Sequence, residues 1–117
     1  MASAFHQGDI IDLDLDPCVG HEQSGRRPAM IVSRDLFHAQ CGLLVVCPIT
    51  SRNRSSPFHV PVSGTRHTTG FVLCDQVRTI DPVARNACLR DHAPQRLLLE
   101  VSDVLIGMVE VLGQPLD

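Results

Sequence analysis

The chain has 117 residues and a mass of 12.8 kDa, which suits one domain whose core needs neither disulfides nor metal to fold. Its hydrophobic content of 44% and charged content of 20% are typical of a soluble globular protein. The longest apolar run, LLVVC at 43–47, is far too short to cross a bilayer. The start, MASAFHQGD, lacks the basic and apolar regions of a signal peptide, so we expect a cytoplasmic protein with no membrane partner.

Charge is unevenly distributed along the chain. A net charge of −3 argues by itself against a nucleic-acid binder. Residues 1–19 and 80–117 are acidic, whereas residues 20–79 carry seven arginines and a net charge of +4. All basic residues are arginines, whose planar guanidinium suits phosphate and carboxylate, although we attribute the lack of lysine to genomic base composition. The middle of the chain is therefore locally basic.

The cysteines predict neither a disulfide framework nor a metal site. Their number, five, is odd and no two form a C-x-x-C motif. Cys47 and Cys74 lie in apolar runs, where we expect free cysteines to behave as small buried hydrophobes. A zinc site built on Cys18 and His21 would need two further ligands, and the sequence offers none at suitable spacing. We therefore expect no metal and no cofactor.

Short strands are predicted over most of the chain. Residues 8–16, GDIIDLDLD, alternate apolar and acidic side chains as in a half-buried strand, which Pro17 would end. Residues 20–27 form a polar loop, and 28–33 and 43–49 are apolar runs typical of interior strands. After a loop at 52–57, alternation at Phe58, Val60 and Val62 indicates another strand, and 70–78 gives one or two more. Such strands, separated by Gly, Pro and Ser turns, predict a small barrel or sandwich.

The C-terminal part is predicted to be helical. Residues 91–94 offer an N-cap and a proline near the first helical position. Apolar residues recur at helical spacing from Leu97 to Leu112, and Gly113 follows as a stop signal. We therefore expect a single domain over 1–117, with a mostly β barrel at about 8–90 and a helix at about 94–112 packed on it.

Three polar segments follow or precede the predicted strands. The loop before residue 28 carries Glu22, Arg26 and Arg27, with His21 beside them. The run ending at Ile49 is followed by a Thr–Ser pair, and the run ending at Cys74 by Asp-Gln-Val-Arg. A carboxylate, an arginine and a hydroxyl suffice for metal-free phosphoryl transfer, if these segments meet at one rim. A solvated loop with a surface Arg–Glu pair explains the same residues without catalysis.

Four motifs in this order resemble the MazF/PemK family of toxin endoribonucleases: GDIIDLDLDP, GHEQSGRRPAMIVS, CPIT and GFVLCDQVRTID. The resemblance runs from about Gly8 to Gly113. It implies an SH3-like small barrel of antiparallel strands with a C-terminal helix, as in the MazF, PemK and CcdB-like proteins, working as a homodimer. It also implies a metal-independent, sequence-specific nuclease that cleaves single-stranded RNA, messenger RNA above all, and is neutralised by a cognate antitoxin. The products would be a 2′,3′-cyclic phosphate and a 5′-hydroxyl.

The resemblance implies roles for individual residues. The catalytic residues by position are Glu22, Arg27 and Thr50. We expect RNA contacts from neighbouring residues, which are His21, Gln23, Arg26, Ser51, Arg52, Arg54, Phe58, Asp75, Gln76 and Arg78. The remaining histidines are expected at the surface, namely His6, His38, His59, His67 and His92.

One departure keeps alternatives open. A plasmid-borne branch of the family has a catalytic arginine two residues before the aspartate of the D-Q motif, where this chain has Leu73. Asp75 is then expected to be structural or to contact RNA, while Glu22, His21 and Asp75 all remain candidates for the general base. Two other functions also remain: a topoisomerase poison of the CcdB type, or a degenerate toxin that only binds its antitoxin. The topoisomerase poison would not need Glu22, Arg27 and Thr50, yet all three are present, and Leu73 is the one residue that favours the degenerate toxin.

Overall fold

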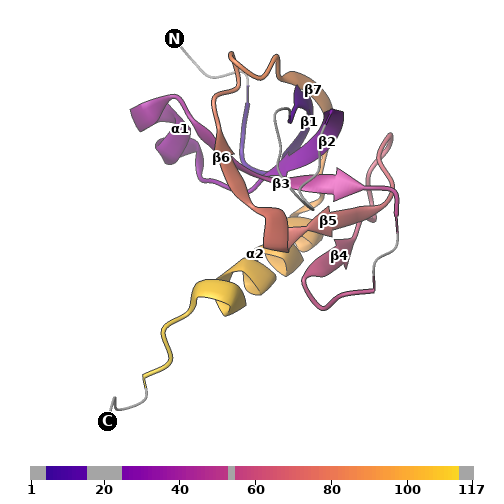
Figure 1. Ribbon diagram of the computed structural model, residues 1–117, viewed down its shortest axis with the longest axis vertical. Helices are drawn as coiled ribbons and strands as arrows, with labels where there is room; N and C mark the ends of the chain where they lie inside the picture. Colours follow the sequence, from indigo (N-terminus) through magenta and orange to yellow (C-terminus); the bar gives the residue numbers. More distant parts are fainter. Residues whose placement is uncertain (1–4, 16–24, 53–54, 114–117) are drawn as a thin grey trace.

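A single curled sheet and a C-terminal helix make up most of the structure, a computed structural model that describes residues 5–15, 25–52 and 55–113 (Figure 1). The strands are β1 (Asp9–Asp14), β2 (Arg26–Ile31), β3 (Leu44–Thr50), β4 (His59–Pro61), β5 (Phe71–Leu73), β6 (Arg78–Ile80) and β7 (Cys88–His92). The helices are α1 (Asp35–Cys41), the 3₁₀ turn η1 (Cys74–Gln76) and α2 (Gln95–Val109). The predicted fold class, mostly β with a C-terminal helix, is confirmed. No helix among the described residues is long and apolar enough to span a membrane.

β3 is the central strand of the sheet. The strands follow the order β4-β5-β3-β2-β1-β7, with β6 paired to β3 outside this path. β2 lies along one edge of β3, while the other edge is shared: β6 pairs with the first half of β3 and β5 with its end. All these pairs are antiparallel. This open sheet is consistent with the small barrel expected from the sequence.

Two apolar clusters lie on opposite faces of the central strands. In the first, Cys47, Ile49 and Val72 pack with Leu97 and Val101 of α2. In the second, residues of β1 and β2 pack with Leu44 and Val46 of β3. Successive side chains of a strand point to opposite faces, so β3 supplies alternate residues to each cluster. The helix thus covers one face of β3 and β5, as Figure 1 shows, and burying its apolar side is what stabilises it there.

The structure departs from the predicted elements at several points. α1 and β7 were not predicted: α1 has no buried residue, and β7 is an edge strand whose residues are exposed apart from Asp91. The C-terminal helix begins at Gln95 and ends at Val109 rather than Leu112, so Gly113 is not its stop. Its N-cap residue is Pro94, which makes no side-chain capping bond, and Asp91 lies in β7.

Candidate functional site

Arg26 and Arg27 are the first two residues of β2, not the end of a loop as predicted. β2 pairs with β3 through Ala29 and Pro48, Met30 and Cys47, and Ile31 and Val46. Continuing this register by two residues sets Arg27 opposite Thr50, the last residue of β3. The pairing itself ends at Ala29 and Pro48, so the register relates Arg27 and Thr50 as the residues two positions beyond the last pair.

The pleat places Arg27 and Thr50 on the same face of the sheet. Side chains separated by an even number of positions in a strand point to the same face. Arg27 is two positions from Ala29 and Thr50 is four positions from Val46, and Ala29 and Val46 both belong to the second apolar cluster. We call the face of β2, β3, β4 and β5 that points away from α2 the site face. Arg27 is exposed at the margin of this face, while Thr50 is buried.

Thr50 is held in place by close backbone packing. Its hydroxyl oxygen accepts a hydrogen bond from the backbone N–H of Arg52 at 3.2 Å. Gly70, with a φ of +118°, approaches so closely that a Cβ there would overlap the Thr50 carbonyl oxygen. Thr50 also pairs with Phe71 of β5. Thr50 is therefore fixed at the end of β3, where β5 pairs with it.

Asp75 follows β5 in the η1 turn and is paired with His59 of β4. The His59 Nε2 lies 3.1 Å from Asp75 Oδ1, and the His59 side chain is only 7% exposed against 43% for Asp75. The expectation that His59 lies at the surface is therefore wrong. His59 pairs with Leu73 of β5, which is fully buried on the site face, and this neighbour cannot be read from the sequence.

Two further predicted RNA contacts, Gln76 at the end of η1 and Arg78 at the start of β6, are half-buried. Arg78 opens β6, pairs with Val46 of β3 and is half-buried. Its guanidinium donates to the Leu15 carbonyl oxygen at 3.5 Å. Because it is opposite Val46, Arg78 also belongs to the side of the sheet that carries Arg27 and Thr50.

Arg26 has a different environment from its neighbour Arg27. Its guanidinium donates to Asp14 Oδ1 at 3.1 Å and to the Asn86 carbonyl oxygen at 3.0 Å. Hydrogen bonds from Asn86 and from Arg26 hold the pKa of the Asp14 carboxyl below its usual value. The sequence predicted an RNA contact here, and the structure shows a guanidinium with several protein acceptors.

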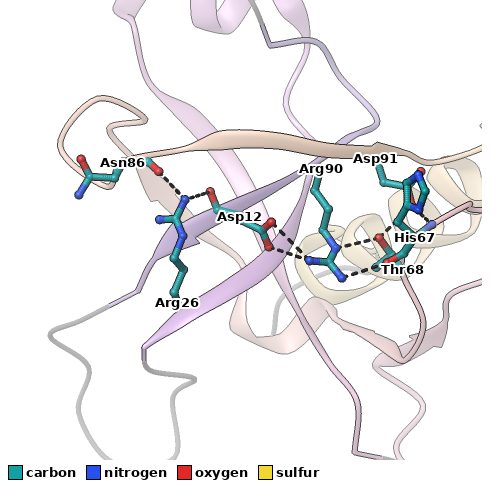
Figure 2. Close-up of polar contacts among 7 residues, drawn as sticks. All are labelled: Asp12, Arg26, His67, Thr68, Asn86, Arg90 and Asp91. Carbon is teal, nitrogen blue, oxygen red and sulfur yellow. Dashed lines mark hydrogen bonds and ion pairs between the residues drawn. The ribbon is translucent and has the colours of Figure 1, made fainter.

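Arg26 is one end of a larger group of paired side chains, which Figure 2 shows in part. Arg90 donates to the Asp12 carboxylate at 3.2 Å and to the Thr68 hydroxyl at 3.2 Å. Burial alone would raise the pKa of Asp91, but hydrogen bonds from the backbone of His67 and His92, the Thr68 hydroxyl and the Arg66 backbone lower it to about 2. We call this group the surface network: Asp12, Asp14, Arg26, Thr68, Asn86, Arg90 and Asp91.

The remaining predicted contacts divide into exposed residues and residues outside the described ranges. Ser51 and Arg52 are exposed directly after β3, and the Phe58 side chain is 43% exposed before β4. Outside the described residues lie Glu22, His21, Gln23 and Arg54. The site face thus carries an arginine and a hydroxyl that the register of β2 and β3 relates, while the Asp75 carboxylate lies on η1 beside His59 of β4.

Cys47 and Cys74 behave as predicted. Both are buried in the first apolar cluster. A hydrogen bond with Cys74, together with burial, raises the pKa of the Cys47 thiol, so it stays protonated. Cys41 and Cys88 are exposed instead. Among the described residues, no three His, Cys, Asp or Glu side chains are grouped to hold a metal ion.

Comparison with known proteins identifies the family. A family model described as the PemK-like, MazF-like toxin of type II toxin–antitoxin systems matches residues 6–109. Endoribonuclease PemK of Escherichia coli is 41% identical over 103 residues, covering 85% of this chain and 77% of that protein. The crystal structure of MazF from Deinococcus radiodurans has a TM-score of 0.82 at 36% identity and covers 88% of this chain and 94% of its own. A MazE–MazF crystal structure from the same organism has a TM-score of 0.78 at 35% identity, with 91% and 96% covered. The chain therefore belongs to the PemK-like, MazF-like toxins of type II toxin–antitoxin systems.

Proposed function

We propose that this protein is the toxin of a type II toxin–antitoxin pair and a sequence-specific endoribonuclease that cleaves single-stranded RNA, in particular messenger RNA. The observation that carries the proposal is the register of β2 and β3, which, continued two residues beyond the Ala29–Pro48 pair, sets Arg27 opposite Thr50 on the site face. Membership of a family whose relatives are named endoribonucleases supports the same function.

The proposed reaction is transesterification. The ribose 2′-hydroxyl attacks the adjacent phosphorus, so that an O2′–P bond forms while the P–O5′ bond breaks. Glu22 accepts the proton of the 2′-hydroxyl, and the departing 5′-oxygen takes up a proton to become a hydroxyl. Arg27 donates to the phosphorane oxygens as negative charge develops, and the Thr50 hydroxyl adds a hydrogen bond. The products are a 2′,3′-cyclic phosphate and a 5′-hydroxyl, and no step requires a metal or cofactor.

We also propose two protein partners. The first is a second copy of the chain, giving a homodimer with a continuous basic surface. The second is a cognate antitoxin, consistent with the family description and with the MazE–MazF assembly among the similar structures. An acidic antitoxin segment that folds on contact would offer carboxylates to the arginines that otherwise bind phosphate.

The alternatives make different demands on the same residues. A topoisomerase poison needs neither an arginine nor a hydroxyl at the Arg27–Thr50 position, and the relatives of this chain are named endoribonucleases. A degenerate toxin would keep the fold without turnover. Leu73 is the residue that favours this second alternative, because it is fully buried and cannot donate to a phosphate.

The deciding experiment incubates the purified protein with a long single-stranded RNA, with and without a metal chelator, and maps the ends of the products. We expect cleavage that survives the chelator and leaves cyclic phosphate ends. Glu22→Gln keeps the size of the side chain but removes the base, and should lower turnover by about 10²–10⁴. If RNA stays intact with the wild-type protein, the nuclease proposal fails. If Glu22→Gln is active and His21→Ala is not, the base is His21.

A further inference from the structure

The His59–Asp75 pair is unusual because one of its polar atoms is buried without a partner. Nε2 of His59 lies 3.1 Å from Asp75 Oδ1, and the side chain is 7% exposed. Nδ1 of the same ring is buried and has no hydrogen-bond partner among the described residues. Buried polar atoms without partners are few in folded proteins, so each one calls for an explanation.

The pairing fixes the roles of the two ring nitrogens. An ionised carboxylate only accepts hydrogen bonds, so Nε2 carries the hydrogen and donates it to Asp75. In the neutral ring Nδ1 is then the acceptor, and it is this acceptor that lies buried without a donor among the described residues. An apolar side chain at residue 59 would avoid that cost to folding. What His59 adds over such a side chain is one directed hydrogen bond to Asp75.

The Asp75 carboxylate is held on one side and open on the other. It is 43% exposed, and His59 makes its one hydrogen bond among the described residues, to Oδ1. Oδ2 is therefore left to accept from a ligand. A carboxylate repels the phosphates of RNA, whereas the amino groups of bases are donors that carboxylates accept from.

An exposed aromatic residue, Phe58, directly precedes β4, and its backbone is hydrogen-bonded to η1. Phe58 is 43% exposed, and its carbonyl oxygen accepts the backbone N–H of Cys74, the residue before Asp75, at 3.0 Å. Unpaired bases are bound by stacking on aromatic side chains and by hydrogen bonds to their edges. The backbone bond between Phe58 and Cys74 thus brings a residue suited to stacking close in the fold to a residue suited to accepting from a base edge.

We propose that His59 is a positioning residue that directs the Asp75 carboxylate outward, where Asp75 accepts a hydrogen bond from the amino group of an unpaired RNA base stacked on Phe58. The pair then helps to determine which base is tolerated at one position of the cleavage site. This inference rests on the proposed ribonuclease function and adds a specificity role to it.

The test compares cleavage-site maps and kinetics on one long single-stranded RNA. Asp75→Ala removes the acceptor, His59→Phe removes the donor, and His59→Gln keeps an N–H near the place of Nε2. We expect Asp75→Ala and His59→Phe to lose the same base preference at one position, with KM raised about 10-fold and kcat changed much less. His59→Gln should restore the preference. The double variant His59→Phe with Asp75→Ala should be no worse than Asp75→Ala.

His6→Phe is the matched control, because His6 forms an exposed pair with Asp35, at 3.0 Å, near α1. Its cleavage map should equal that of the wild type. A folded His59→Phe protein with the wild-type map and KM would overturn the proposal. So would an Asp75→Ala variant that loses kcat at every site with KM unchanged, since Asp75 would then act in the chemistry. If His59→Phe does not fold, the maps of His59→Gln and Asp75→Ala decide. A wild-type protein that cleaves no RNA contradicts the proposed function itself, which is a different result.

Discussion

The surface network and the site face differ in how completely their polar side chains are paired. In the surface network, Arg26 and Arg90 each donate to several protein acceptors, some of which Figure 2 draws. Asp91 accepts from four groups, which are the backbone N–H groups of Arg66, His67 and His92 and the Thr68 hydroxyl. At the site face, His59 leaves one ring nitrogen without a partner among the described residues, and Asp75 has one described hydrogen bond. A satisfied network contributes to stability, whereas incomplete pairing leaves groups for a ligand.

Arg26 of the surface network and Arg27 of the site face are adjacent in the sequence, so substituting each in turn tests this comparison directly. Arg27→Ala should lower RNA cleavage by about 10²–10³, because it removes a donor to the charged phosphorane. Arg27→Lys should recover only part of this, since a lysine cannot make the two-pronged contact. Arg26→Ala, which breaks the exposed pair with Asp14, should change turnover by less than about 10-fold and leave the free energy of unfolding nearly unchanged, because solvent screens exposed ion pairs.

Steady-state cleavage of one RNA by the three variants, with kcat and KM determined separately, measures these effects. Wild-type rates with Arg27→Ala would remove Arg27 from the mechanism and shift attention to Arg78. A raised KM in Arg26→Ala with unchanged kcat would support the RNA contact that the sequence predicted for Arg26.

The backbone beside Thr50 should be the most sensitive structural feature of the site face. Gly70→Ala combines strain at a φ of +118° with an overlap on the Thr50 carbonyl, and we expect a loss of about 3 kcal/mol in the free energy of unfolding. Gly42→Ala is the matched control: its φ is +76°, but a Cβ there meets nothing within 4 Å. It should cost about 1 kcal/mol. Urea unfolding of both variants checks this. Equal losses in the free energy of unfolding would show that the backbone shifts to accommodate the Cβ at residue 70 at no added cost.

The sequence predicted the strands in which apolar and polar side chains alternate, and the helix in which apolar side chains recur at helical spacing. β1 and α2 are examples, since each buries a clear apolar side. α1 was missed because none of its residues is buried, and β7 because an edge strand with exposed residues carries no alternation. Arg26 and Arg27 belong to β2 because they pair with β1. Composition does not reveal this pairing.

The candidate site was only partly predictable for a similar reason. Arg27 and Thr50 were selected by a family resemblance, and their opposition follows from a register that a sequence alone does not give. His59 was missed because a histidine in a short strand has no sequence mark of burial. Its contact depends on η1, which brings Asp75 back to β4.

Within the surface network, Asp91 should make stability depend on pH. Its pKa is lowered from 3.8 to about 2, so it contributes stability that is fully present above pH 4 and is lost as pH falls through 2. We expect Asp91→Asn to lower the free energy of unfolding by about 2 kcal/mol at pH 7, and the gap to the wild type to close between pH 4 and 2. Unfolding measured across this range tests it, and a gap that stays constant with pH would assign the loss to packing.

The smallest effect is expected from the two arginines that follow β3 in the sequence. Arg52 is exposed, and a guanidinium in solvent contributes to RNA binding mainly by releasing counterions from phosphates. Reversing the charge at Arg52 and Arg54 (Arg52→Glu with Arg54→Glu) should weaken RNA binding and lower the slope of log K against log salt by about 0.7 for each phosphate that the variant no longer neutralises. If an acidic antitoxin segment occupies the same basic surface, the double variant should also bind the antitoxin more weakly, while its melting temperature stays near that of the wild type. Fluorescence anisotropy with labelled RNA, and then with the antitoxin, measures both affinities over a salt series. A variant that loses RNA affinity but holds its antitoxin unchanged would show that carboxylate and phosphate do not share one surface, and that inhibition acts elsewhere on the toxin.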